Sequence, residues 1–262
     1  MSRVDPERFG GIARLYGAAA LPRLAMAHVV VVGVGGVGAW TVEALARSGI
    51  GRLTLIDGDD VCVTNTNRQL PALEGEIGRP KVVVLAERMR RINPCLEIHP
   101  VTEFFLESNS ERLLAGRCDW IVDAVDRMSI KSLLLARARE RALPVLTVGG
   151  AGGRLDPTQV RCAPLSRSGG DALLRQVRRK LRRDFGWTAD DLDAVPAIFS
   201  AEPQRFPTPE GGVCLNRGEA TDHLRMDCAS GYGAATFVTG TFGFVAAAEI
   251  VRRLAGMSGT VT

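Results

Sequence analysis

The chain has 262 residues, of which 46% are hydrophobic and 24% charged, and its formal net charge is +4. This composition is typical of a globular protein with one sizeable core and excludes a disordered chain. Six scattered cysteines without a Cys-x-x-Cys pair argue against a zinc site and a disulfide framework. The charged N-terminus lacks an apolar signal segment, so we expect a cytoplasmic protein whose mild basicity is compatible with an RNA partner.

Apolar runs alternate with helical patterns over the first half of the chain. The runs predict strands at 28–32, 53–57, 96–100, 120–124 and 145–148, and the patterns between them predict helices near 37–48, 80–92, 108–115 and 129–141. This alternation predicts an α/β fold with a doubly wound, mostly parallel sheet of the Rossmann type. A strand at 158–163 opens an irregular C-terminal half, which we expect to extend the fold and not to form an independent domain.

A glycine-rich turn follows the first predicted strand, with glycines at Gly33, Gly35, Gly36 and Gly38. Gly-x-Gly-x-x-Gly lets the backbone N–H groups and the helix N-terminus approach a phosphate closely. Asp57 closes the second predicted strand, where an acidic residue can hold ribose hydroxyls. The pattern predicts a nucleotide site, and by itself it fits any nucleotide.

Further polar residues suit a triphosphate better than the pyrophosphate of a dinucleotide. Asn67, Arg68 and Gln69 form a run of hydrogen-bond donors in a predicted loop. The alternative is that these side chains are solvated surface residues without a ligand. Lys81 stands in the first turn of a predicted helix, where a cation opposes the helix dipole at a cost of about 0.3–1 kcal/mol. A bound phosphate would offset that cost, and a solvated lysine is the alternative. We therefore expect ATP as the nucleotide.

Asp126 follows the fourth predicted strand by two residues, which places it in the crevice at the carboxyl ends of the strands. A carboxylate that faces phosphates implies a metal between them, so Asp126 is the candidate Mg²⁺ ligand. The alternative is a helix N-cap. Asp59 is either a second ribose or metal contact or only a turn residue.

Four motifs occur in a fixed order, at residues 8–17, 60–69, 149–153 and 226–231. In this order they resemble the ubiquitin-activating-enzyme-like adenylating enzymes, which include the activators of molybdopterin and thiamine sulfur carriers. Within that superfamily they are most similar to the bacterial dehydratases of threonylcarbamoyladenosine in tRNA. The resemblance implies one adenylating domain at 8–255, with a nucleotide-binding half at 8–150 and a half for substrate, RNA and interface contacts at 151–255.

This resemblance implies a reaction. ATP converts the carboxylate of threonylcarbamoyladenosine, beside the tRNA anticodon, into an acyl-adenylate, and the carbamoyl nitrogen then closes a ring, so that AMP and pyrophosphate are released. It implies catalytic roles for Arg68, Lys81 and Asp126, and a conditional one for Cys228, which is otherwise a structural thiol. It implies no DNA partner.

Three other functions are compatible with parts of the pattern. The main alternative is adenylation of a ubiquitin-like sulfur-carrier protein with Cys228 as acceptor, against which the missing Cys-x-x-Cys pairs count. A nicotinamide oxidoreductase would leave the run 67–69 and Lys81 unexplained. A non-catalytic RNA-binding module would turn over no nucleotide.

The resemblance also implies a homodimer in which an arginine near the N-terminus reaches the partner's nucleotide site. Gly11 stands at the position of that arginine, so Arg8 or Arg14 is the candidate here.

Two segments of the second half have helical patterns. Apolar residues at helical spacing over 174–185 predict a helix whose other faces carry Arg175, Arg178, Arg179, Lys180, Arg182 and Arg183. This charge run either binds the tRNA phosphates or is a solvated basic face. The apolar segment 234–248 is shorter than the ~20 residues of a membrane span, and we expect a buried or interfacial helix there, not a membrane anchor.

Overall fold

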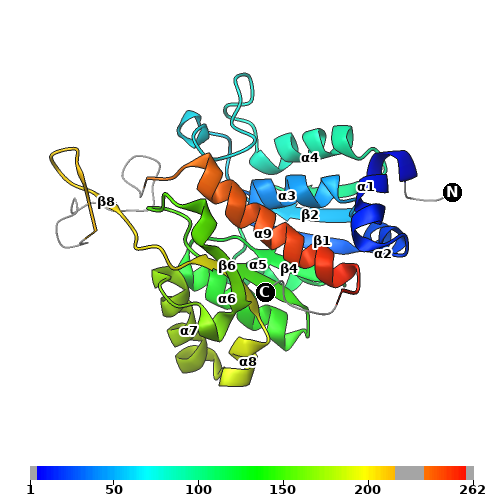
Figure 1. The fold of residues 1–262 in the computed structure, drawn as a ribbon. Helices are drawn as coiled ribbons and strands as arrows, with labels where there is room; N and C mark the ends of the chain where they lie inside the picture. Colours follow the sequence, from blue (N-terminus) through cyan, green and yellow to red (C-terminus); the bar gives the residue numbers. More distant parts are fainter. Residues whose placement is uncertain (1–4, 216–232, 258–262) are drawn as a thin grey trace.

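A seven-stranded sheet forms the centre of the computed structural model, which describes residues 5–215 and 233–257 (Figure 1). The strand order is β3-β2-β1-β4-β5-β7-β6, and only β6 runs antiparallel to its neighbour. The strands are β1 (His28–Val32), β2 (Arg52–Ile56), β3 (Glu97–Val101), β4 (Trp120–Asp123), β5 (Val145–Val148), β6 (Val160–Pro164) and β7 (Pro196–Ser200). The predicted doubly wound, mostly parallel sheet is confirmed.

Helices cover both faces of the sheet (Figure 1). One face packs against α2 (Ala20–Met26), α3 (Gly38–Arg47), α4 (Lys81–Ile92) and α9 (Thr236–Leu254). The other packs against α5 (Glu107–Leu113), α6 (Met128–Glu140), α7 (Ala172–Phe185) and α8 (Ala189–Asp193). Because successive strand residues point to opposite faces, Val29 and Val31 enter the first core, and Val30 and Val32 enter the second.

The remaining elements lie at the margins of the sheet. Helix α1 (Pro6–Tyr16) precedes α2, and β8 (Phe206–Pro207) and β9 (Val213–Cys214) form a small separate hairpin. Short 3-10 turns occur at Val63–Asn65, Pro157–Gln159 and Leu165–Arg167.

All strands and helices predicted for the first half are present with ends within two residues of the prediction. The second half extends the same sheet through β6 and β7, and β7, which we did not predict, lies between β5 and β6. Residues 236–248 of the predicted apolar segment lie within α9, which is buried in the core through Phe242 and Ile250. None of the described helices is long and apolar enough to cross a membrane.

The glycine-rich turn is built on two close backbone approaches. Gly33 has a φ of +85°, and a Cβ there would lie 2.9 Å from the carbonyl oxygen of Ala124, at the end of β4. A Cβ on Gly38, the first residue of α3, would lie 1.9 Å from the carbonyl oxygen of Gly33. The turn thus brings β1, α3 and the end of β4 together only because these positions are glycine.

We expect Gly38→Ala to destabilise the fold by about 3 kcal/mol or more, because the methyl group overlaps a backbone oxygen that cannot move away easily. Gly116→Ala is the control, since a Cβ at Gly116 meets no atom within 4 Å. Urea unfolding measures both changes. Equal stability of the two variants would show that the turn tolerates a side chain at Gly38.

Candidate functional site

Asp57 fixes the conformation of the glycine-rich turn from the end of β2. Its Oδ2 accepts the Val34 N–H at 2.7 Å, and its Oδ1 accepts the Asp59 N–H at 2.9 Å. Burial raises the pKa of Asp57, while these two amide donors and the nearby Lys81 lower it. A carboxylate has about four acceptor positions, so Asp57 keeps capacity for further donors such as ribose hydroxyls.

Arg68 lies over the glycine-rich turn. The Cγ of its side chain is 3.5 Å from the position of a Cβ on Gly36, and its carbonyl accepts the Trp40 indole N–H at 3.1 Å. Nη1 donates to the carbonyl of Thr64 and to Asn67 Oδ1, both at 2.9 Å. Arg68 forms no ion pair with a described carboxylate, so its charge is free for an anion beside the turn.

Gln69 is buried beside the same turn. Its Nε2 lies 3.8 Å from the position of a Cβ on Gly35, while its Oε1 is buried without a hydrogen-bond partner in the described part of the chain. An unsatisfied buried acceptor costs about 1–3 kcal/mol, so a donor on a bound molecule would stabilise this position.

The other amides of this loop are structural. Asn67 Nδ2 donates to the carbonyl of Ala234 at 2.8 Å and so ties the loop to the start of α9. Asn65, which the sequence analysis did not single out, is buried, and its Oδ1 accepts the Cys62 N–H at 3.1 Å. Asn67 therefore positions Arg68 and Gln69, in addition to its predicted role in nucleotide binding.

Lys81 and Asp59 form an ion pair that the sequence analysis did not foresee. Lys81 Nζ lies 2.8 Å from Asp59 Oδ2, and the lysine side chain is 5% exposed whereas the aspartate side chain is 53% exposed. The carboxylate of Asp59 therefore offsets the unfavourable position of Lys81 at the start of α4. The ion pair holds the charge of Lys81 in one place close to Asp57. Asp59 therefore fixes Lys81 and is not only a turn residue.

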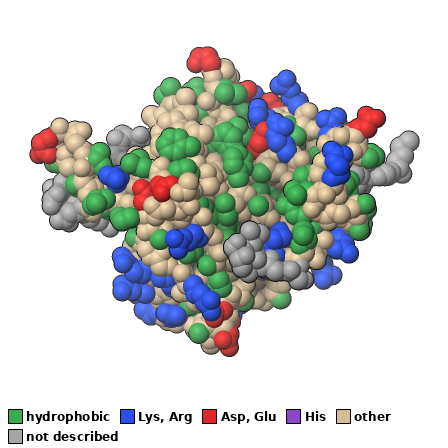
Figure 2. Space-filling model, in the orientation of Figure 1, with side chains coloured by type: hydrophobic (Ala, Val, Ile, Leu, Met, Phe, Trp, Pro, Cys, Tyr) green, Lys and Arg blue, Asp and Glu red, His purple; other side chains and the backbone are tan. Residues whose placement is uncertain are grey.

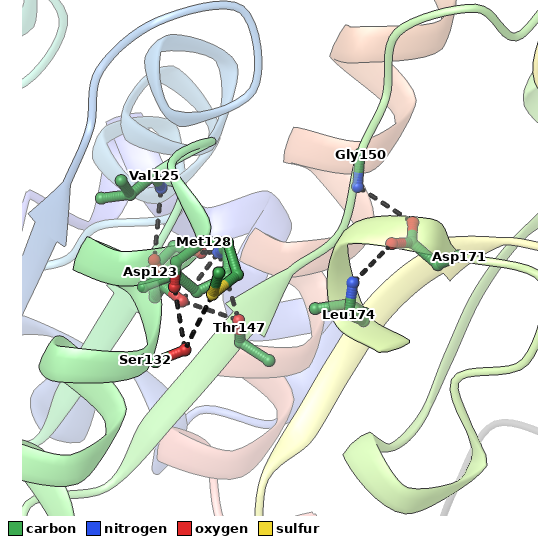
Figure 3. Close-up of polar contacts among 9 residues, drawn as sticks. Asp123, Val125, Met128, Ser132, Thr147, Gly150, Asp171 and Leu174 are labelled. Carbon is green, nitrogen blue, oxygen red and sulfur yellow. Dashed lines mark hydrogen bonds and ion pairs between the residues drawn. The ribbon is translucent and has the colours of Figure 1, made fainter. Parts of the chain in front are cut away.

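Asp123, the last residue of β4, is fully buried in an ion pair with Lys131, and Figure 3 shows it beside Val125 and Thr147. The Lys131 Nζ lies 2.7 Å from Asp123 Oδ2, which also accepts the Thr147 hydroxyl at 2.7 Å. The Val125 N–H donates to Asp123 Oδ1 at 3.2 Å. Burial raises the pKa of Asp123, and these three donors oppose the shift. The network fixes the backbone from which Asp126 projects.

Asp126 itself is exposed and makes no hydrogen bond or ion pair with any residue in 5–215 or 233–257. The N-cap of α6 is Arg127, and no side chain caps this helix, so the alternative of an N-cap role for Asp126 is wrong. Its carboxylate is therefore free at the carboxyl end of β4.

A second buried charge network holds the loop that follows β5. Arg154 is 2% exposed, and its guanidinium donates to the carbonyl of Gly150 at 2.8 Å and to Asp171 Oδ2 at 3.2 Å. Asp171 also accepts the N–H of Gly150 at 2.9 Å and that of Leu174 at 2.8 Å (Figure 3). The motif 149–153 is thus fixed to the first turn of α7, a contact between distant segments that no local pattern signals.

Mg²⁺ binds through one or two carboxylates together with phosphate oxygens and water. Asp126 offers one such free carboxylate, which fits a metal that is completed by nucleotide phosphates. In the described ranges no three His, Cys, Asp or Glu side chains form a metal-binding group. Cys228 and the motif 226–231 lie outside the described residues.

The two candidate arginines of the N-terminal segment differ in their contacts. Arg8 is held by its own chain, since Nη1 donates to the carbonyl of Ile92 at 3.0 Å and Nε to Asp5 at 3.3 Å. Arg14 folds back along α1, where its Nη1 lies 3.5 Å from the position of a Cβ on Gly10. Its guanidinium has no polar partner in the part of the chain that the structure describes.

Comparisons with known proteins agree with this geometry. The model of the ThiF family matches residues 11–261. The tRNA threonylcarbamoyladenosine dehydratase of Escherichia coli (strain K12) is 46% identical, over 95% of this chain and 93% of the relative. The enzyme of that name from Haemophilus influenzae is 44% identical, over 97% of this chain and 96% of the relative.

The chain belongs to the ThiF family, among its tRNA threonylcarbamoyladenosine dehydratases. Solved structures of this family support the fold. The E. coli dehydratase TcdA in complex with ATP has a TM-score of 0.83 and 41% identity, with 96% of this chain and 95% of that chain covered. The complex of TcdA with AMP has a TM-score of 0.84. The family resemblance that the four motifs indicated is confirmed.

We expect Lys131→Met to destabilise the protein by about 3–5 kcal/mol, because it leaves the Asp123 carboxylate buried without its cation. The double variant Lys131→Met/Asp123→Leu removes both charges and should recover a large part of that loss. Unfolding by guanidinium chloride provides the three free energies. A double variant that is as unstable as the single one would contradict this account of the pair.

Proposed function

We propose that this chain is an ATP-dependent enzyme that adenylates the carboxylate of threonylcarbamoyladenosine in tRNA and dehydrates it to a cyclic form, with release of AMP and pyrophosphate. The observation that carries the proposal is the 46% identity, over nearly the whole of both chains, with a relative named as this dehydratase. The structures of TcdA with ATP and with AMP support an adenylating reaction, since they contain the substrate nucleotide and the released nucleotide.

In the proposed site, the glycine-rich turn and the N-terminus of α3 receive the phosphates of ATP. Asp57 accepts the ribose hydroxyls, and Arg68, Lys81 and Gln69 lie around the phosphate path. The free guanidinium of Arg68 supports a phosphate contact, whereas the unsatisfied Oε1 of Gln69 is an acceptor and supports a contact with a donor of the nucleotide, such as a ribose hydroxyl. Asn67 completes the set by holding the loop, and Asp59 by holding Lys81.

The chemistry has two steps. A carboxylate oxygen of the substrate attacks the α-phosphorus of ATP, the bond to the β-phosphate oxygen breaks, and pyrophosphate leaves. The carbamoyl nitrogen then attacks the acyl carbon and loses its proton, and AMP leaves with the former carboxylate oxygen. Arg68 and Lys81 would stabilise the negative charge that grows on the phosphate oxygens during the first step. The substrate supplies its own nucleophile, so the reaction requires no covalent intermediate on Cys228.

Asp126 is the proposed ligand of Mg²⁺, because its carboxylate is free at the carboxyl end of β4. When bound there, the ion would neutralise phosphate charge and polarise the α-phosphate. Asp123 is already neutralised by Lys131, so Asp126 alone is available from this segment.

Activation of a sulfur carrier receives less support. The molybdopterin-synthase adenylyltransferase of Salmonella typhimurium is 35% identical, but over only 50% of this chain and 51% of the relative. In this alternative function, Cys228 would act as the acceptor in the transfer of sulfur with a partner protein.

We further propose that residues 8–255 act as one adenylating domain and that the enzyme is a homodimer. In such a dimer Arg14 is the candidate that reaches the partner's nucleotide, because Arg8 is held by Ile92 and Asp5 of its own chain. Dimerisation would then complete each active site.

Release of AMP and pyrophosphate should require tRNA that carries threonylcarbamoyladenosine. We expect tRNA from cells able to make this modification to stimulate release, and tRNA that lacks it to have no effect. Asp126→Ala should lower the rate by at least about 100-fold, the cost of losing one group that stabilises the transition state. Asp190→Ala, in the exposed first turn of α8, is the control. No stimulation by either RNA would contradict the proposed function.

Complementation tests the role of Arg14 across the dimer. Arg14→Ala and Asp126→Ala should each be inactive, and their co-expression should restore about a quarter of the wild-type rate, because half of the dimers are mixed and each mixed dimer has one intact site. Arg8→Ala alone should stay active. Co-expressed variants that remain inactive would refute a contribution of Arg14 in trans.

A further inference from the structure

Helix α7 has an unusual balance of charge. Its 14 residues include six basic side chains and one acidic side chain, Asp184. Two of the basic side chains pair with this aspartate, since Lys180 Nζ lies 2.6 Å from Asp184 Oδ2 and Arg183 Nε lies 2.5 Å from Asp184 Oδ1. A third, Arg178, turns inward and donates to the carbonyl of Ser168 at 2.9 Å. The remaining three are Arg175, Arg179 and Arg182.

Arg175, Arg179 and Arg182 form one exposed row, which we call the arginine stripe. Residues three and four apart in a helix are neighbours on its surface, so the three guanidinium groups follow one another along α7. None of them has a hydrogen bond or ion pair with a residue in the described ranges. In Figure 2 the Lys and Arg side chains gather at the lower left, where Figure 1 places α7.

The charges of the arginine stripe destabilise helix α7 in the isolated protein. Like charges at these spacings destabilise a helix by about 0.2–0.5 kcal/mol per pair. The pKa of Arg178 is lowered, first by burial and then by the charges of Arg182 and Arg175. A solvated basic face usually carries acidic residues between the basic ones, and α7 has no carboxylate within the stripe. A polyanion would relieve this repulsion.

The start of the stripe is fixed to the active-site edge of the sheet. Asp171 caps α7 and accepts the N–H of Gly150, which follows β5. A Cβ on Gly149 would lie 2.4 Å from Asp171 Oδ2, so the loop approaches the start of the helix more closely than a side chain at Gly149 would allow. Strand β5 is the neighbour of β4, and Asp126 follows the end of β4. From Arg175 the stripe extends away from that edge by roughly 10 Å, at about 1.5 Å per residue.

We propose that the arginine stripe binds backbone phosphates of the tRNA substrate and holds the RNA while its modified adenosine enters the site between β1 and β4. This inference rests on the proposed function for the identity of the polyanion. Guanidinium groups suit phosphate oxygens because they donate two parallel hydrogen bonds. Such contacts position a nucleic acid without reading its sequence, which suits an enzyme whose specificity lies in one modified base.

The test is the salt dependence of tRNA binding, with tRNA that carries threonylcarbamoyladenosine as the probe. Each phosphate contact contributes about 0.7–0.9 to the slope of log affinity against log salt. We expect the triple variant Arg175→Gln/Arg179→Gln/Arg182→Gln to weaken binding and to reduce the magnitude of that slope by about 2–3. The corresponding triple substitution by Lys keeps the charges and should retain most of the slope. Turnover at saturating tRNA and the KM for ATP should stay unchanged in both.

A charge-matched control replaces three exposed arginines elsewhere, Arg91, Arg112 and Arg117, by Gln. Wild-type slope and affinity in the Gln variant of the stripe would overturn the proposal, as would an equal loss in this control, which would indicate only the net charge. Exposed substitutions of this kind rarely unfold a protein, and the unfolding midpoint verifies this.

The same experiment separates this inference from the proposed function. A wild-type protein that binds tRNA through the stripe but releases no AMP would contradict the dehydratase function and keep the stripe. A Gln variant with full AMP release and an unchanged salt slope would support the dehydratase function and contradict the role of the stripe.

Discussion

The parallel pairing of β1 with β4 is the constraint on which the rest of the site depends. Val29 to Val32 pair with Trp120 to Asp123, and the sheet is built outward from there in both directions, with β2 and β3 on one side and β5, β7 and β6 on the other. The chain continues from β1 to β2 on one side and from β4 to β5 on the other, and open α/β sheets bind ligands at the carboxyl ends of the strands at such a switch point. Gly33 fits against Ala124 at this switch point only because it has no Cβ.

Buried charges hold the loops at this switch point in place. Lys131 and Asp123 fix the end of β4, and Arg154 and Asp171 fix the loop after β5. Such pairs contribute little net stability, because the free-energy cost of removing both charges from water largely cancels their mutual attraction. Their directional hydrogen bonds nevertheless allow only one arrangement of each loop. This explains how the exposed Asp126 keeps its position without partners of its own among the residues that the structure describes.

The sequence predicted the features that follow local rules. The strand pattern, the glycine-rich turn and the polar run 67–69 depend on neighbours in the chain, and each is where it was expected. The pairings of Lys81 with Asp59 and of Arg154 with Asp171 were not predicted, because they join residues 22 and 17 positions apart. The spacing of two charges does not tell whether the fold brings them together. The strand β7 was not predicted because Pro196 opens it, and a proline in an apolar run argues against a central strand.

Transfer of the carboxylate oxygen tests the central claim most directly. Threonylcarbamoyladenosine in tRNA would be labelled with ¹⁸O in its carboxylate and incubated with ATP, Mg²⁺ and the enzyme. Mass spectrometry would then measure the ¹⁸O content of the AMP and of the cyclised tRNA. Adenylation requires that one labelled oxygen leaves with AMP, because that oxygen attacks the α-phosphorus and departs with it. Unlabelled AMP beside cyclised tRNA would contradict the account, since the carboxylate would then have been activated at another phosphorus atom or without ATP.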